Sequence, residues 1–236
     1  MTVPATADES LEAVYAGIAS YYTSKIRKHG ISPAGVDWSC VPTQELRFVQ
    51  LLKLCDFSAP FALNDLGCGY GALRSFIARR HDPTAIDYLG IDLSGAMIRR
   101  ARRLWRDDEA VKFVQGRTAP RVADYSVASG IFNVRQDQGV ELWECFVMRT
   151  LTQLHAVSRR GFAVNFIASP ALGRPARPGV YQTDPDRWVR WCERELGGSA
   201  DAVAGYGMRE FTLLVRPAVQ PALPSAQGNR SHPPTA

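Results

Sequence analysis

Apolar positions along the chain follow two alternating patterns, one typical of buried strands and the other of amphipathic helices. Short apolar runs bounded by glycine or polar residues favour strands that are covered on both faces. Apolar residues that recur every three to four positions favour helices with one buried face. The strands are predicted at residues 61–66, 85–91, 111–115, 122–129 and 161–167. The helices are predicted at residues 71–80, 94–106, 141–157 and 186–196, and β-like runs follow at 200–205 and 210–216.

This alternation predicts an α/β fold. Strands separated by helical crossovers imply a mainly parallel sheet with helices on both faces. In such sheets ligands bind beyond the carboxyl ends of the strands, near the point where the strand order reverses. The residues that follow the first four predicted strands are therefore the first candidates for a binding site.

The segment before the first strand has a different pattern and is expected to form a helical lid over residues 9–57. It contains a helical stretch at 11–28, a loop-like stretch at 30–41 and a second helix at 43–55, for which Thr43 is a possible N-cap. The main domain is expected to span residues 58–216. Residues 1–8 are polar and 217–236 are rich in Pro, Ala and Ser, so both ends are expected to be disordered.

Composition narrows the class of protein. The chain has 236 residues, of which 46% are hydrophobic and 22% charged, with a net charge of +5. Much of the positive charge comes from arginine pairs near predicted helix ends, where they complement helix dipoles and solvate the surface, so a nucleic-acid partner is not expected. Five cysteines without a CxxC pair predict neither a disulfide framework nor a metal site. Neither a membrane span nor a secretory signal is recognisable, which predicts a cytoplasmic protein.

The most informative segment is the glycine-rich stretch between the first predicted strand and the helix after it. Gly67, Gly69 and Gly71 permit positive φ and allow a ligand to lie against bare backbone. With Ala72 this stretch also fits the dinucleotide-binding pattern. Asp65 argues for a different ligand, because a carboxylate beside the loop suits an ammonium group and disfavours a pyrophosphate.

Asp92 ends the second predicted strand, one strand over from the glycine-rich stretch. A carboxylate there can accept two hydrogen bonds from ribose hydroxyls. Its alternative role is to cap the helix that follows, for which Ser94 is the predicted N-cap.

Two segments resemble the signature of class I S-adenosylmethionine (SAM)-dependent methyltransferases. They are Leu-Asn-Asp-Leu-Gly-Cys-Gly-Tyr-Gly at 63–71 and Tyr-Leu-Gly-Ile-Asp-Leu-Ser at 88–94, followed by Met97. The resemblance covers roughly residues 20–216. It implies SAM as the cofactor and a Rossmann-like seven-stranded sheet of order 3-2-1-4-5-7-6, whose seventh strand is antiparallel.

Cofactor roles follow from the resemblance, position by position. The glycine-rich stretch would underlie the methionine part of SAM, Asp65 would lie near its ammonium group, Asp92 would bind the ribose, and two apolar side chains would border the adenine. The residues so implied are Asp65, Gly67, Cys68, Gly69, Asp92, Leu93 and Met97.

One departure concerns the adenine. Many relatives have an aspartate after the third strand that accepts a hydrogen bond from the adenine amino group, but this chain has Gln-Gly-Arg-Thr at 115–118. A guanidinium cannot accept a hydrogen bond. The adenine would then be held by backbone groups, by Thr118, or by stacking of Arg117.

The segment after the fourth strand would form the methyl-transfer site. Ser129, Gly130, Phe132 and Asn133 are the candidates, although Phe132 with Ile131 also fits a plain core role. The segment resembles a bacterial small-molecule-type subset of the family. It lacks the Asn-Pro-Pro-Tyr motif of enzymes that methylate amines of nucleic acids or glutamine.

Further candidates come from the predicted lid. His29 is a candidate general base or a solvent-facing helix end, and Tyr22 a candidate pocket hydroxyl or packing residue. Gln44 and Arg47 are candidates to reach the SAM carboxylate, with a surface role as the alternative for both. Trp38 is a candidate cap for the pocket.

The function predicted from these residues is methyl transfer from SAM to oxygen or nitrogen of a small metabolite by a monomer or homodimer. The enclosing aromatic lid favours a small acceptor, since a macromolecule needs an open groove. The alternatives are a nucleic-acid or protein methyltransferase, a SAM-binding protein without catalysis, and an NAD-dependent oxidoreductase.

Overall fold

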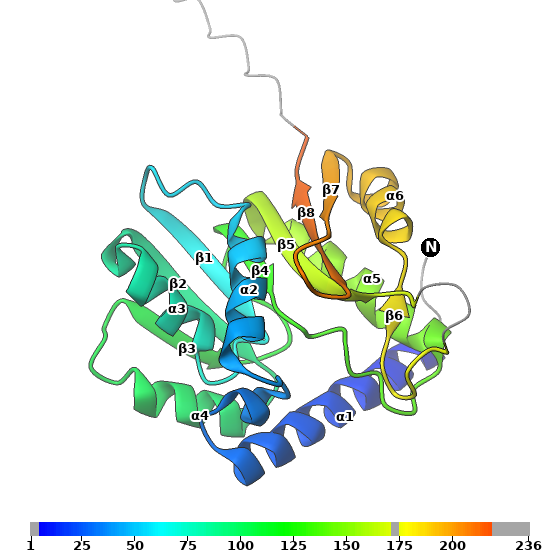
Figure 1. Ribbon diagram of the computed structural model, residues 1–236, viewed down its shortest axis with the longest axis horizontal. Coiled ribbons are helices and arrows are strands. Elements are labelled where there is room, and N and C mark those ends of the chain that lie inside the picture. Colours follow the sequence, from blue (N-terminus) through cyan, green and yellow to red (C-terminus); the bar gives the residue numbers. More distant parts are fainter. Residues whose placement is uncertain (1–4, 171–174, 219–236) are drawn as a thin grey trace, which may run out of the picture.

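The computed structural model describes residues 5–170 and 175–218, and its centre is one twisted sheet (Figure 1). The strand order is β3-β2-β1-β4-β5-β8-β7, and the short β6 pairs with β5. Strands β1 to β5 are parallel to one another, whereas β8 runs antiparallel to both of its neighbours, β5 and β7. The strands are β1 (Phe61–Leu66), β2 (Ile86–Asp92), β3 (Val111–Gln115), β4 (Ala123–Ala128), β5 (Ser158–Ala168), β6 (Gln182–Thr183), β7 (Ser199–Val203) and β8 (Glu210–Arg216). This confirms the sheet order and the antiparallel last strand, while β6 was not predicted.

Helices cover both faces of the sheet and bury two large cores, and a third, small cluster consists of Ile26, Tyr70, Ala96 and Met97. The helices are α1 (Ala5–His29), η1 (Pro33–Val36), α2 (Val41–Leu52), α3 (Ala72–Arg80), η2 (Pro83–Ala85), α4 (Gly95–Leu104), α5 (Val140–Ala156) and α6 (Pro185–Leu196). Side chains of α2, α3 and α4 pack with one core, and side chains of α1, α5 and α6 with the other. Alternate strand residues supply the two cores, so Tyr88 belongs to the first and Leu89 to the second.

The connection from β3 to β4 is short, and α1 takes the place of a crossover helix. Residues 116–122 join the two strands directly, although β2 and β1 lie between them. Strands are spaced about 4.8 Å apart, so this span of roughly 14 Å is within reach of an extended segment of that length. The first half of α1 buries Leu11, Val14 and Ile18 in the core that also contains Leu89 of β2. The sheet face that this short connection leaves uncovered is therefore covered by a helix from before the sheet.

Helix α1 also reaches the opposite face. It contacts α5 in its early turns and α4 in its later turns, along the lower edge of the molecule in Figure 1. Thr23 of α1 hydrogen-bonds the hydroxyl of Ser94 (2.7 Å), which itself accepts from the Met97 amide and is the N-cap of α4, as predicted. The helix thus extends from the core that contains α5 to the small cluster in which Ile26 packs with Tyr70, Ala96 and Met97.

Two helix starts differ from prediction. Helix α1 begins at Ala5, so residues 5–8, expected to be disordered, form its first turn; Asp8 there pairs with Arg149 of α5, which fixes this turn to the fold. Helix α2 begins at Val41 with Cys40 as N-cap, because Pro42 is tolerated in a first helical turn and Thr43 lies inside the helix. Residues 1–4 and 219–236, also expected to be disordered, lie outside the described residues.

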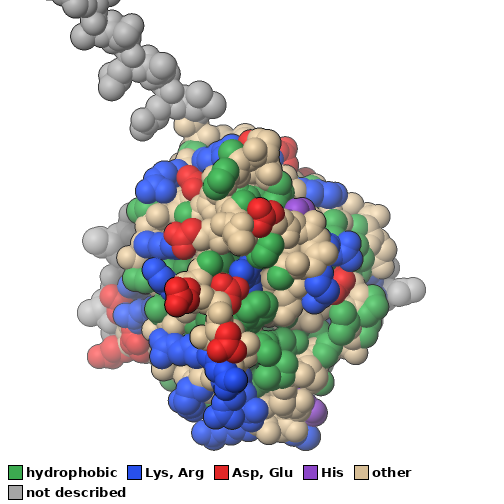
Figure 2. Space-filling view, turned by 90° about the vertical axis from the view of Figure 1, so that its left-hand side faces the viewer, with side chains coloured by type: hydrophobic (Ala, Val, Ile, Leu, Met, Phe, Trp, Pro, Cys, Tyr) green, Lys and Arg blue, Asp and Glu red, His purple; other side chains and the backbone are tan. Residues whose placement is uncertain are grey.

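Arginine side chains gather on the surface, as expected from their positions near helix ends. Figure 2 shows Lys and Arg side chains toward the bottom of the face that carries α4, where Arg99, Arg100 and Arg103 are exposed. Arg79 and Arg80 both pair with Glu45. None of the helices within residues 5–170 and 175–218 combines the length and apolar character needed to cross a bilayer.

Candidate active site

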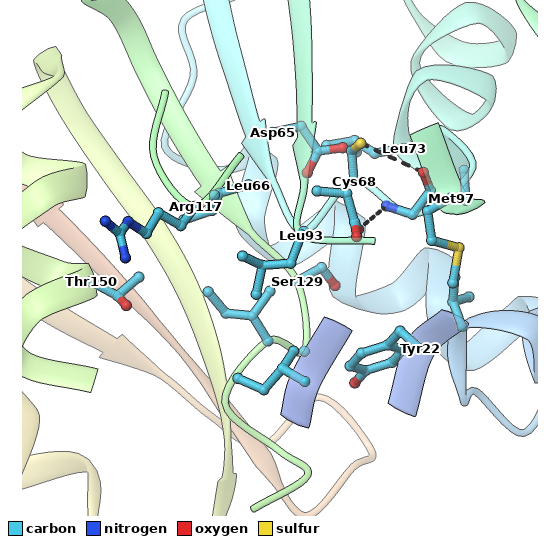
Figure 3. Close-up of a pocket in the computed structure, with 18 of the residues that line it drawn as sticks. Tyr22, Asp65, Leu66, Cys68, Leu73, Leu93, Met97, Arg117, Ser129 and Thr150 are labelled. Carbon is cyan, nitrogen blue, oxygen red and sulfur yellow. Dashed lines mark hydrogen bonds between the residues drawn. The ribbon is translucent and has the colours of Figure 1, made fainter. Parts of the chain in front are cut away.

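A cavity lies at the carboxyl ends of β1, β2 and β4, where the strand order predicted it. Its walls come from the glycine-rich loop, from the residues after β2, β3 and β4, and from α1, η1, α2 and α5. In Figure 3, Arg117 and Thr150 lie to the left, Cys68 and Met97 to the right, and Leu93 and Ser129 between them. The candidates from sequence that line this cavity are Tyr22, Trp38, Gln44, Asp65, Gly67, Cys68, Gly69, Asp92, Leu93, Met97, Arg117, Ser129 and Gly130.

The glycine-rich loop is fixed to β2 by backbone hydrogen bonds. The amides of Gly67 and Cys68 both donate to the carbonyl oxygen of Ile91, at 2.7 and 3.0 Å. Gly67 and Gly69 have φ values of 77° and 57°, which disfavour any residue with a β-carbon. A β-carbon at Gly67 would also be 2.2 Å from Cγ2 of Ile131. Backbone conformation and close packing therefore both require glycine at position 67.

Asp92 connects the loop to the start of α4. One carboxylate oxygen accepts from the Gly69 amide at 2.9 Å and the other from the Ser94 amide at 2.7 Å. Each oxygen can accept a second hydrogen bond. Burial raises the pKa of Asp92 to about 6, although these two amide hydrogen bonds oppose the increase. Asp92 is therefore a group of the cavity wall that also fixes the residue before α4, while Ser94 and not Asp92 is the N-cap of that helix.

Asp65 is the second buried carboxyl of the cavity. It accepts a hydrogen bond from the Tyr88 hydroxyl, and only 2% of it is exposed. Its pKa is raised to about 7, chiefly by burial and to a smaller extent by the neighbouring Asp92, against the opposing effect of the Tyr88 hydrogen bond. No Lys or Arg within the described residues forms an ion pair with Asp65 or Asp92. Two carboxyls without a cation make this part of the cavity suited to a positively charged ligand.

Two further residues of the cavity wall carry a polar group without a partner among the described residues. The hydroxyls of Tyr15 and Ser129 are buried and have no hydrogen-bond partner among the described residues. Leaving a buried hydroxyl unpaired costs about 1–3 kcal/mol. Both groups therefore favour a ligand with hydrogen-bonding atoms.

Arg47 does not have the role expected from its sequence position. Its Nε donates to Glu210 of β8 at 2.6 Å, its Nη2 donates to the other oxygen of the same carboxylate, and its Nη1 donates to the Thr43 carbonyl at 2.8 Å. It is absent from the cavity wall. The prediction that Arg47 reaches the SAM carboxylate is therefore wrong, because a buried acid holds its guanidinium. Gln44, the other candidate for that role, is buried and lines the cavity.

The same acid helps to fix two walls of the cavity. The Arg47 guanidinium lies 3.8 Å from the ring centroid of Trp38, which lines the cavity. Glu210 also accepts from the Asn165 amide at 3.4 Å, and Asn165 in turn accepts from the Gly130 amide at 2.8 Å. The side chain of Trp38 and the backbone of Gly130 are thus connected through one carboxylate outside the cavity.

Four further candidates, besides Arg47, lie outside the cavity wall. His29 is exposed at the last residue of α1, which matches its alternative reading as a solvent-facing helix end. Thr118 does not line the cavity, because the turn after β3 brings Gly116 and Arg117 to it instead. Phe132 is stacked on Phe166 at 5.0 Å and belongs to the core, the alternative noted from sequence.

Asn133 is the fourth. It is buried beside Gly130, and its side-chain amide has no partner among the described residues. The chain turns away from the cavity at Gly130. Beyond this turn, the Asn133 carbonyl accepts a hydrogen bond from the Tyr181 amide at 2.9 Å.

Tyr22 lines the cavity, but its raised pKa argues against a role as general base. Burial, with smaller effects from Asp37, Tyr21 and Asp92, raises its pKa far above the ordinary value. Its hydroxyl therefore stays protonated near neutral pH.

Sequence reasoning missed several residues of the cavity wall. Tyr15 and Ile18 lie on the face of α1 that also presents Tyr22, and their helical spacing was the available signal. Phe146 and Thr150 of α5 line the cavity too, and both belong to the apolar face predicted for that helix. Val36 gave no signal, because its position depends on Asp37, whose carboxylate accepts from Tyr21 and Lys25 of α1.

Comparisons with known proteins agree with this geometry. A family model described as a methyltransferase domain matches residues 64–140. A protein of Mycobacterium tuberculosis (strain ATCC 25618 / H37Rv) named as a methyltransferase, Rv1506c, is 40% identical over 167 residues, which are 71% of this chain and 99% of that protein.

Solved structures share the fold at low sequence identity. The pyocyanin biosynthetic protein PhzM superimposes with a TM-score of 0.57 at 18% identity, over 74% of this chain and 55% of that chain. Magnesium protoporphyrin IX methyltransferase (ChlM) of Synechocystis PCC 6803, with bound SAH, gives 0.54 at 16% identity, over 74% of this chain and 83% of that chain. Together with the glycine-rich loop, Asp92 and the strand order, the relative at 40% identity shows that the chain belongs to the class I SAM-dependent methyltransferase family.

Proposed function

We propose that the protein transfers the methyl group of SAM to an oxygen or nitrogen atom of a small molecule. The observation that carries this proposal is the cavity, which has two carboxyls without a described cation as partner at the glycine-rich loop and the Trp38 ring against Gly130. The family supplies the cofactor, and the cavity supplies groups that fit it.

The residues present fit SAM in charge and in hydrogen bonding. SAM carries a sulfonium and an ammonium group, and Asp65 and Asp92 offer negative charge that no described cation neutralises. Asp65 would hold the ammonium group, and the free acceptor capacity of Asp92 would bind the ribose hydroxyls. Leu93 and Met97 offer apolar contact for the adenine. When bound, SAM supplies an electrophilic methyl group on its sulfonium.

The small size of the acceptor is inferred from what encloses the cavity. Side chains of α1 and α2 line it, and Val36 and Trp38 close onto the ends of the sheet strands. A β-carbon at Gly69 would be 2.8 Å from Cγ1 of Val36, so this contact leaves no open groove at that point. An enclosed space of this kind favours a small acceptor over a polymer.

The cavity wall favours catalysis by orientation of the acceptor over catalysis by removal of a proton from it. Trp38, Gly130 and Ile131, which we assign to the acceptor side, carry no ionisable side chain, and Tyr22 is held protonated. Fixing a nucleophile in line with a methyl group can by itself remove about 7–11 kcal/mol of the barrier. We therefore propose that the chain orients an acceptor that already has a free lone pair.

Calorimetry tests the cofactor assignment. Wild type is expected to bind SAM and S-adenosylhomocysteine but not NAD, and Asp92→Ala is expected to lose about 2–4 kcal/mol of binding free energy, as for removal of a charged hydrogen-bonding partner. Unchanged affinity in Asp92→Ala would remove the ribose assignment. Release of S-adenosylhomocysteine in the presence of small hydroxyl and amine compounds then tests methyl transfer, and activity on RNA or protein alone would contradict the proposed acceptor class.

A further inference from the structure

The adenine end of the cavity has no acceptor side chain from the turn after β3. The Gln115 amide donates to the Leu93 carbonyl at 3.2 Å on the outside of the fold, and Thr118 does not line the cavity. Arg117 lines it, but its guanidinium has no acceptor atom and is paired with Glu12 of α1. Apart from the backbone of this turn, a group that accepts from the adenine amino group would have to come from another element.

Tyr15 of α1 supplies such a group. Only 7% of the residue is exposed, and its ring is fixed on two sides, by Phe146 edge-on at 5.5 Å and by the Arg117 guanidinium at 5.3 Å from the ring centroid. Tyr15 lines the cavity, and its buried hydroxyl has no partner among the described residues. Since an unpaired buried hydroxyl is costly, a fixed ring that carries one at the cavity wall favours a ligand atom as its partner.

The position of Tyr15 places it near the proposed adenine end of the cavity and away from the side that we assign to the methyl acceptor. Its neighbour Arg117 follows β3, which is the edge strand beyond β2, whereas the Trp38–Gly130 contact lies at the end of β4. Leu93, assigned to the adenine, packs against the same core as Tyr15. The cause is the fold itself, because α1 lies where a helix between β3 and β4 would otherwise cover the sheet.

We infer that the Tyr15 hydroxyl accepts the hydrogen bond from the adenine amino group and so replaces the carboxylate that follows the third strand in many relatives. This inference rests on SAM as the cofactor of the proposed function. A phenol can do this because its oxygen accepts and its hydrogen remains free to donate elsewhere. Recognition of the base then depends on a helix outside the parallel sheet.

The test is a cycle of one protein change and one ligand change. Wild type and Tyr15→Phe are titrated by calorimetry with S-adenosylhomocysteine and with its analogue that lacks the adenine amino group. We expect Tyr15→Phe to weaken binding of the first ligand about fivefold to tenfold, as for loss of one hydrogen bond, and binding of the second less than twofold. Tyr21→Phe is the matched control, because Tyr21 is also on α1 but donates to Asp37 at 2.7 Å and does not line the cavity.

The possible results separate this inference from the proposed function. If wild type binds neither ligand, the cofactor assignment fails and the inference with it. If wild type binds S-adenosylhomocysteine and Tyr15→Phe binds it equally well, the inference alone is overturned. It is also overturned if Tyr15→Phe weakens both ligands by the same factor, since that result means a packing effect. Melting curves of both variants establish that they are folded, which the retained phenyl ring favours.

Discussion

The edge of the Trp38 indole lies against the α-carbon of Gly130, so that a β-carbon at position 130 would be 2.3 Å from Cζ2 and 2.5 Å from Cη2 of the ring. Gly130 also has φ of 74°, a conformation that side chains disfavour. Position 130 is thus restricted twice, once by its own backbone and once by the ring. The two effects can be separated because Gly205 has nearly the same φ, 76°, with no described atom within 4 Å of an added β-carbon.

Gly130→Ala is expected to displace Trp38. Gly205→Ala should cost about 1–2 kcal/mol of unfolding free energy from backbone conformation alone, and Gly130→Ala should cost measurably more. Urea denaturation measures both. Methyl transfer should fall roughly 10- to 100-fold in Gly130→Ala, because the acceptor is misplaced, while affinity for S-adenosylhomocysteine changes little. Equal losses of stability in the two variants would show that the ring is not fixed against residue 130.

Substitutions of the Arg47–Glu210 pair are expected to affect stability and methyl transfer differently. Both side chains are more than nine-tenths buried, so Arg47→Met should leave an uncompensated carboxylate and cost about 3–5 kcal/mol. Arg47→Met combined with Glu210→Met should restore most of that stability, since buried pairs are often replaceable by apolar side chains. Methyl transfer should stay low in the double variant because Trp38 has lost the guanidinium beneath it.

Denaturation and turnover, measured on the same three proteins, decide this prediction. The exposed pair Arg216–Asp201 is a matched control, and Arg216→Met should cost less than about 1 kcal/mol. If the double variant regains full turnover together with its stability, the pair has no role in positioning Trp38.

Stability without ligand is expected to depend on pH through Asp65 and Asp92. Their pKa values are raised to about 7 and about 6, whereas both carboxyls ionise near pH 4 in the unfolded chain. The folded protein therefore retains protons that the unfolded chain releases, and stability should fall as pH rises from about 4 to about 7 and then level off. Melting temperatures across this range measure the effect, and Asp65→Asn should flatten its upper part.

Affinity for SAM should change in the opposite direction. The cation requires ionised carboxylates, so its dissociation constant should fall roughly tenfold between pH 5.5 and 7.5, with release of protons on binding. Calorimetry in buffers of different ionisation enthalpy counts those protons. A pH-independent dissociation constant would contradict the raised pKa values of the site.

The parts of the site that sequence predicted are those fixed by neighbouring residues. Gly67, Gly69 and Asp92 follow directly from where β1 and β2 end, because the carboxyl ends of parallel strands meet at one edge. The order of the sheet followed from the resemblance together with the alternation of strands and helices. Ser94 as N-cap of α4 required only local chemistry.

The parts that sequence did not predict depend on contacts between distant residues. Arg47 is held by Glu210, 163 positions later, and nothing around Arg47 in the sequence indicates that partner. The role inferred for Tyr15 could not be predicted from nearby residues either, because it depends on the direction in which α1 crosses the sheet. His29 is a candidate from its residue type and its place at the end of the first helix, and its alternative role as a solvent-facing helix end is the one that the structure has.

Because of the position of α1, the segment that connects it to α2 affects the wall of the cavity. Its ion pairs with α5 and with the turn after β3 bridge segments more than a hundred residues apart, whereas a single stretch, residues 30–40, tethers its far end to α2. Lengthening that stretch would leave every strand pairing of the sheet intact yet loosen the wall around the cofactor. Changes in this short segment, which itself carries Val36 and Trp38 of the cavity wall, can therefore alter how firmly the enzyme retains its methyl donor without any change to the sheet.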